Sequence, residues 1–110
     1  MTIENSGSID GMGISKTDGK VVLQISDHLD WVNVERHCDL LEKKIGAYLG
    51  FVQSGQLQER LPKAVGRSVR ISVIYQHEPS EFGFKFLNAA KQQLQESGFE
   101  LNYGALPSNY

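Results

Sequence analysis

The amino-acid sequence predicts an α+β fold, specifically a two-layer α/β sandwich in which two helices cover one face of a four-stranded mixed sheet. Three observations support this prediction. Short segments alternate between apolar and polar residues, as half-buried strands do. Two longer segments repeat apolar residues every three or four positions, which is typical of amphipathic helices. These segments follow the order β-β-α-β-α-β, and right-handed crossovers then place both helices on the same side of the sheet.

The first two strands are predicted to form a hairpin. Residues 8–14 carry a weak strand pattern that two glycines interrupt, and residues 21–26 carry a stronger one. Asp18 and Gly19 lie between them and indicate a tight turn, because glycine adopts positive φ without a steric penalty.

The first helix is predicted at residues 31–54, with Asp30 as its N-cap and Gly55 as the left-handed residue that ends it. Gly46 and Gly50 lie inside this helix on one face, and we expect another backbone to approach them closely. The apolar face of the helix contains Val34, Cys38, Leu41, Ile45, Tyr48, Leu49 and Val52. The cysteine on this face is expected to be a buried small hydrophobe.

The second half of the chain is predicted as a connection, a strand, a helix and a last strand. Residues 56–67 contain Pro62 and Gly66 and are expected to form a polar connection that Leu57 and Leu61 could anchor to the core, whereas residues 68–76 alternate cleanly as a strand. The helix is expected at about residues 80–97, ending at Gly98 with a Schellman-type contact, before a strand at residues 99–103. Its buried stripe is expected to contain Phe82, Phe86, Leu87, Ala90 and Leu94.

Polar residues at alternate strand positions predict that the second face of the sheet is open to solvent. These residues are Gln24, Arg70, Ser72, Gln76, Glu100 and Asn102. An open face or an exposed edge is typical of a surface for a partner or for self-association. Phe84 cannot share the buried face of its helix with Phe82 and Phe86, so we expect it at the rim of the core or in contact with a partner.

The chain of 110 residues is long enough for one domain with one modest core. We divide it into a flexible N-terminus at residues 1–7, a single α/β domain at residues 8–103 and a C-terminal tail at residues 104–110. The hydrophobic content of 40% is ordinary for a soluble protein.

Charge and cysteine content limit the expected partners and compartment. The formal net charge of −2 argues against nucleic-acid binding, which needs a basic face to displace counterions from phosphates. No stretch approaches the ~20 apolar residues of a membrane span, and the first residues lack the pattern of a signal peptide. Cys38 is the single cysteine, so no intrachain disulfide can form. We therefore expect a cytoplasmic protein with no nucleic-acid and no membrane partner.

One junction has the highest density of chemical groups in the sequence. Asp27, His28, Asp30 and Trp31 lie where a predicted strand ends and the first helix begins, and they form our candidate binding site. Ligands of open α/β sheets bind at this end of the strands, and the helix N-terminus there is partly positive. His28 could act as a general base between two carboxylates, or His28, Asp30 and His37 could hold a metal ion.

A structural role explains most of the same groups. Asp27 and Asp30 can cap the first helix, and Leu29 or Trp31 can pack as a hydrophobic staple. His37 is expected to be a hydrogen-bonded, partly buried residue of that helix. No catalytic or metal-binding spacing is diagnostic here, so we assign no catalytic residue, no metal ligand and no cofactor.

Several segments together resemble a known family. They are Val22–Trp31, Lys44–Leu49, Gln53–Leu57, Pro79–Glu81 and Ser97–Phe99. Through them, about residues 8–103 of the chain resemble the DUF6572 family of small bacterial proteins, whose function is unknown. The resemblance implies a small bacterial cytosolic domain and supplies no catalytic residues.

Two hypotheses of function follow from these observations. The first is a non-catalytic protein-interaction or accessory module, whose partner is another protein or a second copy of the chain in a homodimer. The alternative is a small-ligand or metal-binding activity at the strand–helix junction around His28. A side chain of His28 that faces solvent, with no pocket beside it, would count against the alternative.

Overall fold

The computed structural model describes residues 8–106 of the chain. Its elements, in chain order, are β1 (Gly11–Ile14), β2 (Val21–Asp27), α1 (Val34–Gln53), α2 (Gln56–Arg60), the short 3-10 helix η1 (Pro62–Ala64), β3 (Val69–Tyr75), α3 (Glu81–Glu96) and β4 (Glu100–Ala105). The predicted N-terminus at residues 1–7, and residues 107–110 of the predicted tail, lie outside the described residues.

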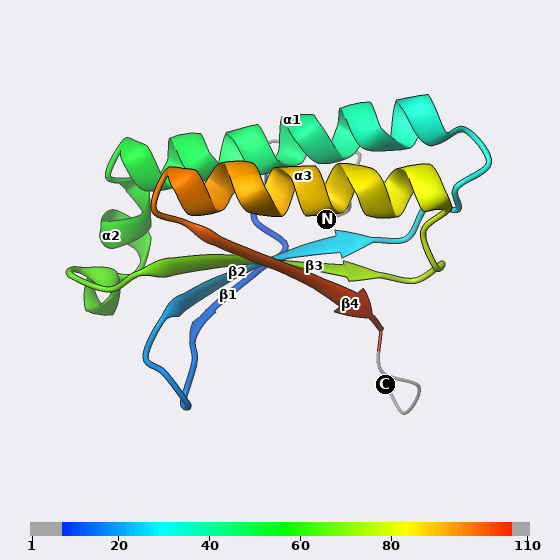
Figure 1. Cartoon of the computed structure of the whole chain (residues 1–110). Helices are drawn as coiled ribbons and strands as arrows, with labels where there is room; N and C mark the ends of the chain where they lie inside the picture. Colours follow the sequence, from blue (N-terminus) through cyan, green and yellow to red (C-terminus); the bar gives the residue numbers. More distant parts are fainter. Residues whose placement is uncertain (1–7, 107–110) are drawn as a thin grey trace.

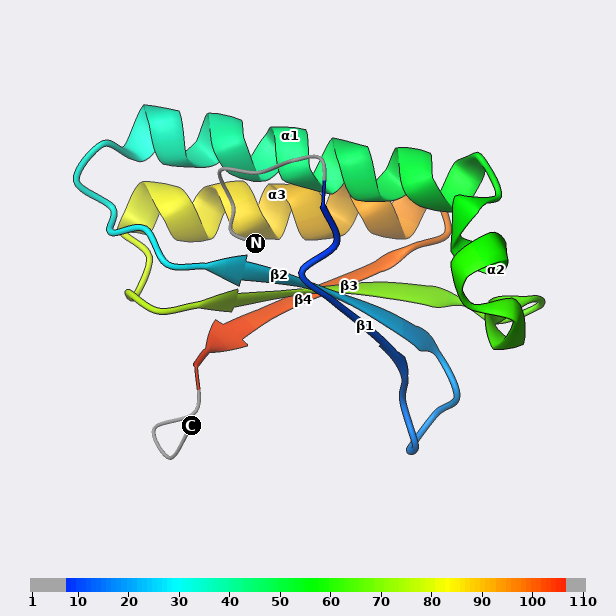
Figure 2. The same cartoon turned by 180° about the vertical axis from the view of Figure 1, so that it is seen from behind.

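The four strands form one mixed sheet in the order β1-β2-β3-β4. Strand β1 pairs with β2 antiparallel, and β2, β3 and β4 pair parallel to one another. Each parallel connection passes through a long helix, and α1 and α3 lie side by side on the same face of the sheet (Figure 1). The view from behind shows the same two layers (Figure 2). The predicted α+β sandwich and its element order are therefore confirmed.

The core lies between the sheet and the two long helices. Alternate residues of β2 and β3 point toward the helices and are buried, as the period of two in a strand requires. The largest fully buried apolar side chains are Tyr48, Leu23, Ile25, Leu41, Leu57, Ile71, Leu87 and Leu101. Cys38 is buried as expected, and burial raises the pKa of its thiol, so the reactive thiolate is disfavoured.

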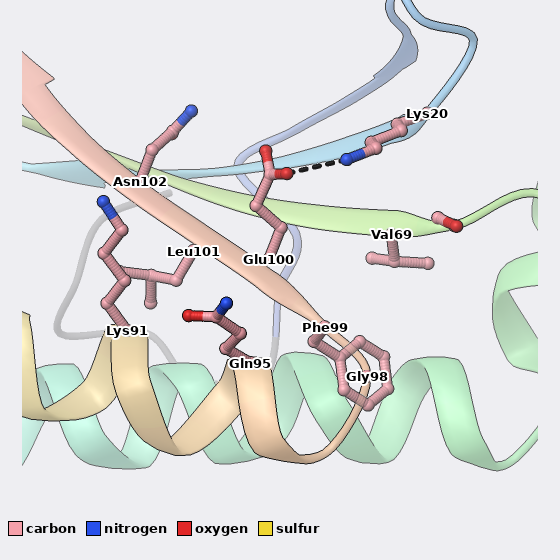
Figure 3. Close-up of a pocket in the computed structure, with 10 residues that line it drawn as sticks. Lys20, Val69, Lys91, Gln95, Gly98, Phe99, Glu100, Leu101 and Asn102 are labelled. Atoms are coloured by element: carbon pink, nitrogen blue, oxygen red, sulfur yellow. Dashed lines mark hydrogen bonds and ion pairs between the residues drawn. The ribbon is translucent and has the colours of Figure 1, made fainter.

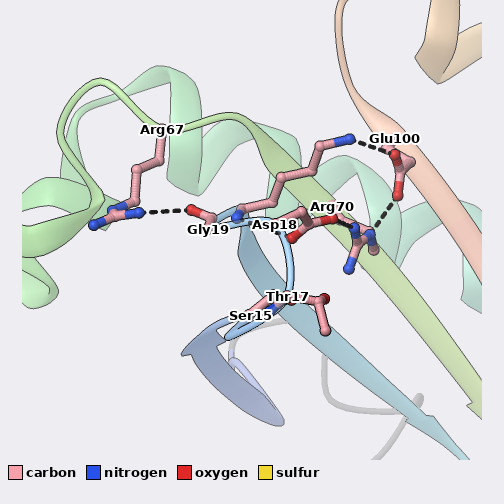
Figure 4. Close-up of polar contacts among 8 residues, drawn as sticks. Ser15, Thr17, Asp18, Gly19, Arg67, Arg70 and Glu100 are labelled. Carbon is pink, nitrogen blue, oxygen red and sulfur yellow. Dashed lines mark hydrogen bonds and ion pairs between the residues drawn. The ribbon is translucent and has the colours of Figure 1, made fainter.

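A network of ion pairs crosses the amino ends of the strands on the open face (Figure 4). Arg70 of β3 bonds to Asp18 of the hairpin turn and to Glu100 of β4. Lys20 Nζ lies 2.7 Å from Glu100 Oε2. Hydrogen bonds from Lys20 and Arg70 hold the pKa of Glu100 below its usual value. The turn also accepts a bond from Arg67, whose Nη1 lies 2.8 Å from the carbonyl oxygen of Gly19.

The segment before β1 is fastened to α1 by buried polar groups. Lys44 Nζ lies 3.0 Å from Asp10 Oδ1 and 2.9 Å from the carbonyl oxygen of Ser8, and neither charged side chain is exposed to solvent. Tyr48 donates its hydroxyl to the carbonyl of Gln24 at 2.6 Å and accepts from the amide of Asp10 at 2.9 Å. Burial raises the pKa of Tyr48 to about 12. No pattern in the sequence indicates this fastening.

Helix α1 begins later than the sequence predicts. Its N-cap is Asn33, whose side chain accepts the amide of Arg36, and Asp30 instead accepts the amide of Val32 within the preceding loop. The predicted N-cap was wrong because the chain needs an extra turn to pass from β2 to the helix layer. The predicted end is right, since Gly55 adopts a positive φ of 87° directly after the last turn.

One further prediction about helices was incomplete, and one was wrong. The polar connection expected at residues 56–67 contains the short helices α2 and η1, and its predicted anchors Leu57 and Leu61 do pack on the core, where Ala64 is also buried. A Cβ built on Gly46 or on Gly50 would meet nothing within 4 Å, so no backbone approaches these glycines. Sequence composition alone does not distinguish an irregular segment from short helices that are anchored by one apolar residue each.

Helix α3 ends as predicted, and the strand after it is longer than predicted. The amide of Phe99 donates to the carbonyl of Leu94, and the amide of Gly98 donates to the carbonyl of Gln95, as in a Schellman motif. Strand β4 continues to Ala105, two residues beyond its predicted end.

The buried stripe of α3 differs from the prediction at its first turn. Phe82 is 58% exposed, whereas Gly83 is buried. A Cβ built on Gly83 would lie 2.7 Å from Cζ3 of Trp31, so the indole packs directly on the helix backbone. The buried stripe therefore begins at Gly83, where the indole packs, and not at Phe82. Phe84 is half-buried, with its ring centroid 6.1 Å from that of Tyr103.

Candidate functional site

The predicted site lies where β2 ends and the chain turns toward α1. Asp27 is the last residue of β2 and continues the inward-facing set of alternate residues, so its carboxylate points under the helix layer and is 2% exposed. One oxygen, Oδ1, accepts the amide of Leu29 at 3.2 Å. The other, Oδ2, lies 2.5 Å from Nε2 of His37.

His37 is the centre of this site. It occupies the first turn of α1, and helical side chains tilt toward the N-terminus, so its ring reaches back over the end of β2. Its Nδ1 lies 2.9 Å from the carbonyl oxygen of Asp30, and its Nε2 faces Asp27. The side chain is 1% exposed.

The two hydrogen bonds of His37 fix the number of protons in the site. The carbonyl of Asp30 can only accept, so Nδ1 carries a proton. The second bond then needs a proton on Nε2 or on the carboxyl group of Asp27. Both arrangements leave the pair with no net charge, which is what a site shielded from water favours.

Trp31 covers the imidazole of His37. The two rings are stacked, with centroids 3.6 Å apart and planes inclined by 19°. The indole Nε1 donates to the carbonyl of His77 at 3.0 Å, which ties the loop after β2 to the loop after β3. The six-membered ring of the indole lies against Gly83 of α3 through Cζ3 and Cε3. The stack therefore joins both helices to the carboxyl end of the sheet.

The structure brings together only some of the predicted site residues. Asp27, Trp31 and the backbone of Asp30 all contact His37, which sequence reasoning offered as a possible metal ligand and otherwise expected to be a hydrogen-bonded residue of the helix. The carboxylate of Asp30 is on the surface, and His28 is an exposed residue. The signal that could have found His37 is its place in the first helical turn, from which a side chain returns toward the strand end.

This arrangement stabilises the junction more readily than it performs chemistry. Both nitrogens of His37 are bonded to protein oxygens, and the indole of Trp31 covers the ring. A general base needs its nitrogen within reach of a substrate proton, and no nitrogen of this ring is available. Among residues 8–106, no group of three or more His, Cys, Asp or Glu side chains is placed to hold a metal ion.

Apolar side chains on the surface flank the covered site. Val32 is 87% exposed and Phe82 is 58% exposed. Val32 follows Trp31 in the sequence, and Phe82 precedes Gly83. Because Trp31 and Gly83 contact each other at the carboxyl end of the sheet, Val32 and Phe82 also lie at that end. Val65, which is 67% exposed, precedes β3 and so lies at the opposite end of the molecule.

A hollow of about 500 Å³ lies beside the amino end of β4 (Figure 3). Lys91 and Gln95 of α3 form one wall, and Lys20 and Glu100 lie across β4 on the open face. The five consecutive residues 98–102 also line it. The hollow is at the other end of the strands from the junction, so it does not include the predicted site residues.

The fold and the junction define a small α+β domain in which the buried groups Asp27 and His37 are bonded to each other. The chain belongs to a family of unknown function, DUF6572, whose family model matches residues 1–107. A search of curated proteins and a search of solved structures found no significant match. No helix within the described part of the chain is both long enough and apolar enough to cross a membrane.

Proposed function

We propose that the protein is a non-catalytic protein-interaction module, and that its partner binds at the junction over Val32 and Phe82. One observation carries the proposal. The buried groups of the junction, Asp27 and His37, are bonded to each other, whereas two large apolar side chains near them, Val32 and Phe82, are exposed to solvent. A pair of exposed apolar residues on a rigid base is typical of the centre of a protein interface.

The stacked rings beneath these residues make the surface rigid. Trp31 is held by the stack with His37, by contact with Gly83 and by the hydrogen bond to the carbonyl of His77. These contacts hold the sequence neighbours of Val32 and Phe82, so the backbone that carries both side chains is ordered before a partner binds and binding costs less conformational entropy. The alternative function, a small-ligand or metal-binding activity around His28, has fewer groups to use because Asp27 is already bonded to His37.

The proposal is tested by affinity capture with matched variants. The double variant Val32→Asp, Phe82→Asp places charge on the surface, and Val65→Asp makes the same change at the opposite end. Proteins captured from a lysate of the native cells are quantified by mass spectrometry, and the main one is purified for titration. We expect the wild type and Val65→Asp to bind it equally, and the double variant to lose at least about tenfold in affinity.

Equal binding by all three proteins, or no saturable binding by the wild type, would contradict the proposal. A titration of the wild type with Zn²⁺ and with small anions, compared with His28→Ala, addresses the alternative. Binding that His28→Ala abolishes, with the fold unchanged, would favour the small-ligand or metal site.

A further inference from the structure

Strand β4 is an edge of the sheet, and its outer hydrogen-bonding groups can be identified. The amide of Leu106 donates to the carbonyl of Tyr75 in β3. Because backbone groups alternate sides along a strand, the even-numbered residues of β4 face β3. The odd-numbered residues Leu101, Tyr103 and Ala105 therefore turn their N–H and C=O groups away from the sheet.

This edge lacks the features that usually prevent strands from pairing. Strand β4 has six residues, with no proline, lysine or arginine. Its single charged residue is Glu100, which is already bonded to Lys20 and Arg70. The opposite edge is less suitable, since β1 has only four residues and two of them are glycine.

We propose that β4 is a self-association surface, on which β4 of a second copy of this chain pairs antiparallel to form a continuous sheet of eight strands. The N–H and C=O groups that β4 turns away from the sheet, on Leu101, Tyr103 and Ala105, are spaced symmetrically about Tyr103. A two-fold axis at that residue therefore pairs Tyr103 with itself, and Leu101 with Ala105 of the second copy. This register satisfies every outward group of both strands and makes about six backbone hydrogen bonds.

The side chains of β4 suit a second copy in this register. Two Tyr103 rings come to lie side by side on the helix-covered face, where each already has Phe84 beside it at 6.1 Å between centroids. Cross-strand aromatic pairs of this kind stabilise antiparallel strands. On the open face, Asn102 lies beside Gly104 of the second copy, which offers no side chain to obstruct it. The two Glu100 carboxylates lie at opposite ends of the paired strands, so they do not repel each other.

The hollow beside β4 leaves room for the end of the second strand. In the proposed register, Leu106 of the second copy lies opposite Glu100, whose neighbours line this hollow (Figure 3). Leu106 is exposed in the single chain. The pairing therefore covers an exposed apolar side chain as well as the edge of the sheet, which is the combination that favours a stable contact.

Ala105 provides the matched pair of variants for the test. Its amide faces outward, so Ala105→Pro removes a donor of the interface without removing a bond to β3, while Ala105→Thr keeps the amide. Sedimentation velocity is measured from about 5 to about 500 µM, since a small interface corresponds to micromolar dissociation. We expect the wild type and Ala105→Thr to approach twice the monomer mass of 12.3 kDa, and Ala105→Pro to stay monomeric.

Hydrogen exchange of the wild-type protein gives a second measurement that does not depend on folding of a variant. The amides of Leu101, Tyr103 and Ala105 should gain protection as concentration rises, whereas those of Asn102 and Gly104 should be protected at every concentration. A wild type that is monomeric at 500 µM, or an Ala105→Pro variant that still dimerises, would overturn the proposal.

The interface is separate from the docking surface proposed above. The double variant Val32→Asp, Phe82→Asp is expected to dimerise like the wild type, so each proposal can fail without the other. Loss of the dimer in that variant, with the fold intact by circular dichroism, would assign self-association to the junction and refute the role of β4.

Discussion

Replacement of His37 by phenylalanine tests whether the buried pair with Asp27 stabilises the junction. Phenylalanine keeps an aromatic ring under Trp31 but removes both ring nitrogens. The carboxylate of Asp27, which is 2% exposed, then loses its partner at Oδ2 and keeps only the amide of Leu29 at Oδ1. The carbonyl of Asp30 also loses its donor.

The expected cost follows from these lost bonds. Removal of one member of a buried charge pair destabilises a protein by about 3–5 kcal/mol, because the other member stays buried without compensation. The unpaired carbonyl of Asp30 is nearer to the surface and adds less. A domain of this size is stable by about 5–15 kcal/mol in total, so His37→Phe should leave a fold that is marginal at room temperature.

A double-mutant cycle separates the pair from the packing around it. Asp27→Leu alone leaves an unsatisfied imidazole nitrogen and should cost about 1–3 kcal/mol. Asp27→Leu with His37→Phe removes both polar groups, so it should cost clearly less than the sum of the two single changes. Urea unfolding followed by circular dichroism measures all four proteins, because the fluorescence of Trp31 is itself altered by changes at residue 37. A single His37→Phe change that costs under about 1 kcal/mol, or a strictly additive cycle, would refute the reasoning.

Three more predictions concern individual positions. Gly46→Ala should raise the free energy of unfolding by up to about 1 kcal/mol, because the position is exposed, helical and free of neighbours within 4 Å; an unchanged or lower melting temperature would contradict this. Gly83→Ala should destabilise by about 1–3 kcal/mol, because its Cβ would press on the ring of Trp31; near-ultraviolet circular dichroism should show the indole displaced. Tyr48 has its pKa raised to about 12 by burial, against about 10 in the unfolded chain, so its stabilising effect is complete below pH ~10 and is lost as pH rises toward ~12. The stability difference between wild type and Tyr48→Phe should therefore shrink by up to about 3 kcal/mol over that interval, and a constant difference would show that the hydroxyl is not buried in the native state.

The regular elements could be predicted because their signals are local. Alternation along β2 and β3, and the apolar periodicity of α1, each depend on a few neighbouring residues. The glycines that end α1 and α3 could be found for the same reason, since left-handed backbone after a helix strongly favours glycine.

The errors arise where a distant segment decides the outcome. Phe82 fits the apolar stripe of its helix, but the buried position of the first turn is Gly83, against which Trp31 packs from some fifty residues earlier. Asp30 has the right chemistry for an N-cap, yet Asn33 takes that position because of the path between the two layers. At the candidate site, the sequence identified Asp27 and Trp31 but not their contact with His37, since a pair ten residues apart has no fixed spacing in a loop.

The fastening of residues 8–10 to α1 has a consequence for the order of folding. Strand β1 leaves the ribosome first, but it is short and contains two glycines, so it has little tendency to form by itself. Its anchors are Lys44 and Tyr48, which follow Asp10 by 34 and 38 residues. The edge of the sheet that is synthesised first can therefore be secured only after most of α1 has been made. Until then the amide of Ser26, which the side chain of Asp10 later covers, remains open on β2, and a nascent chain that stalls in this interval exposes an unprotected strand.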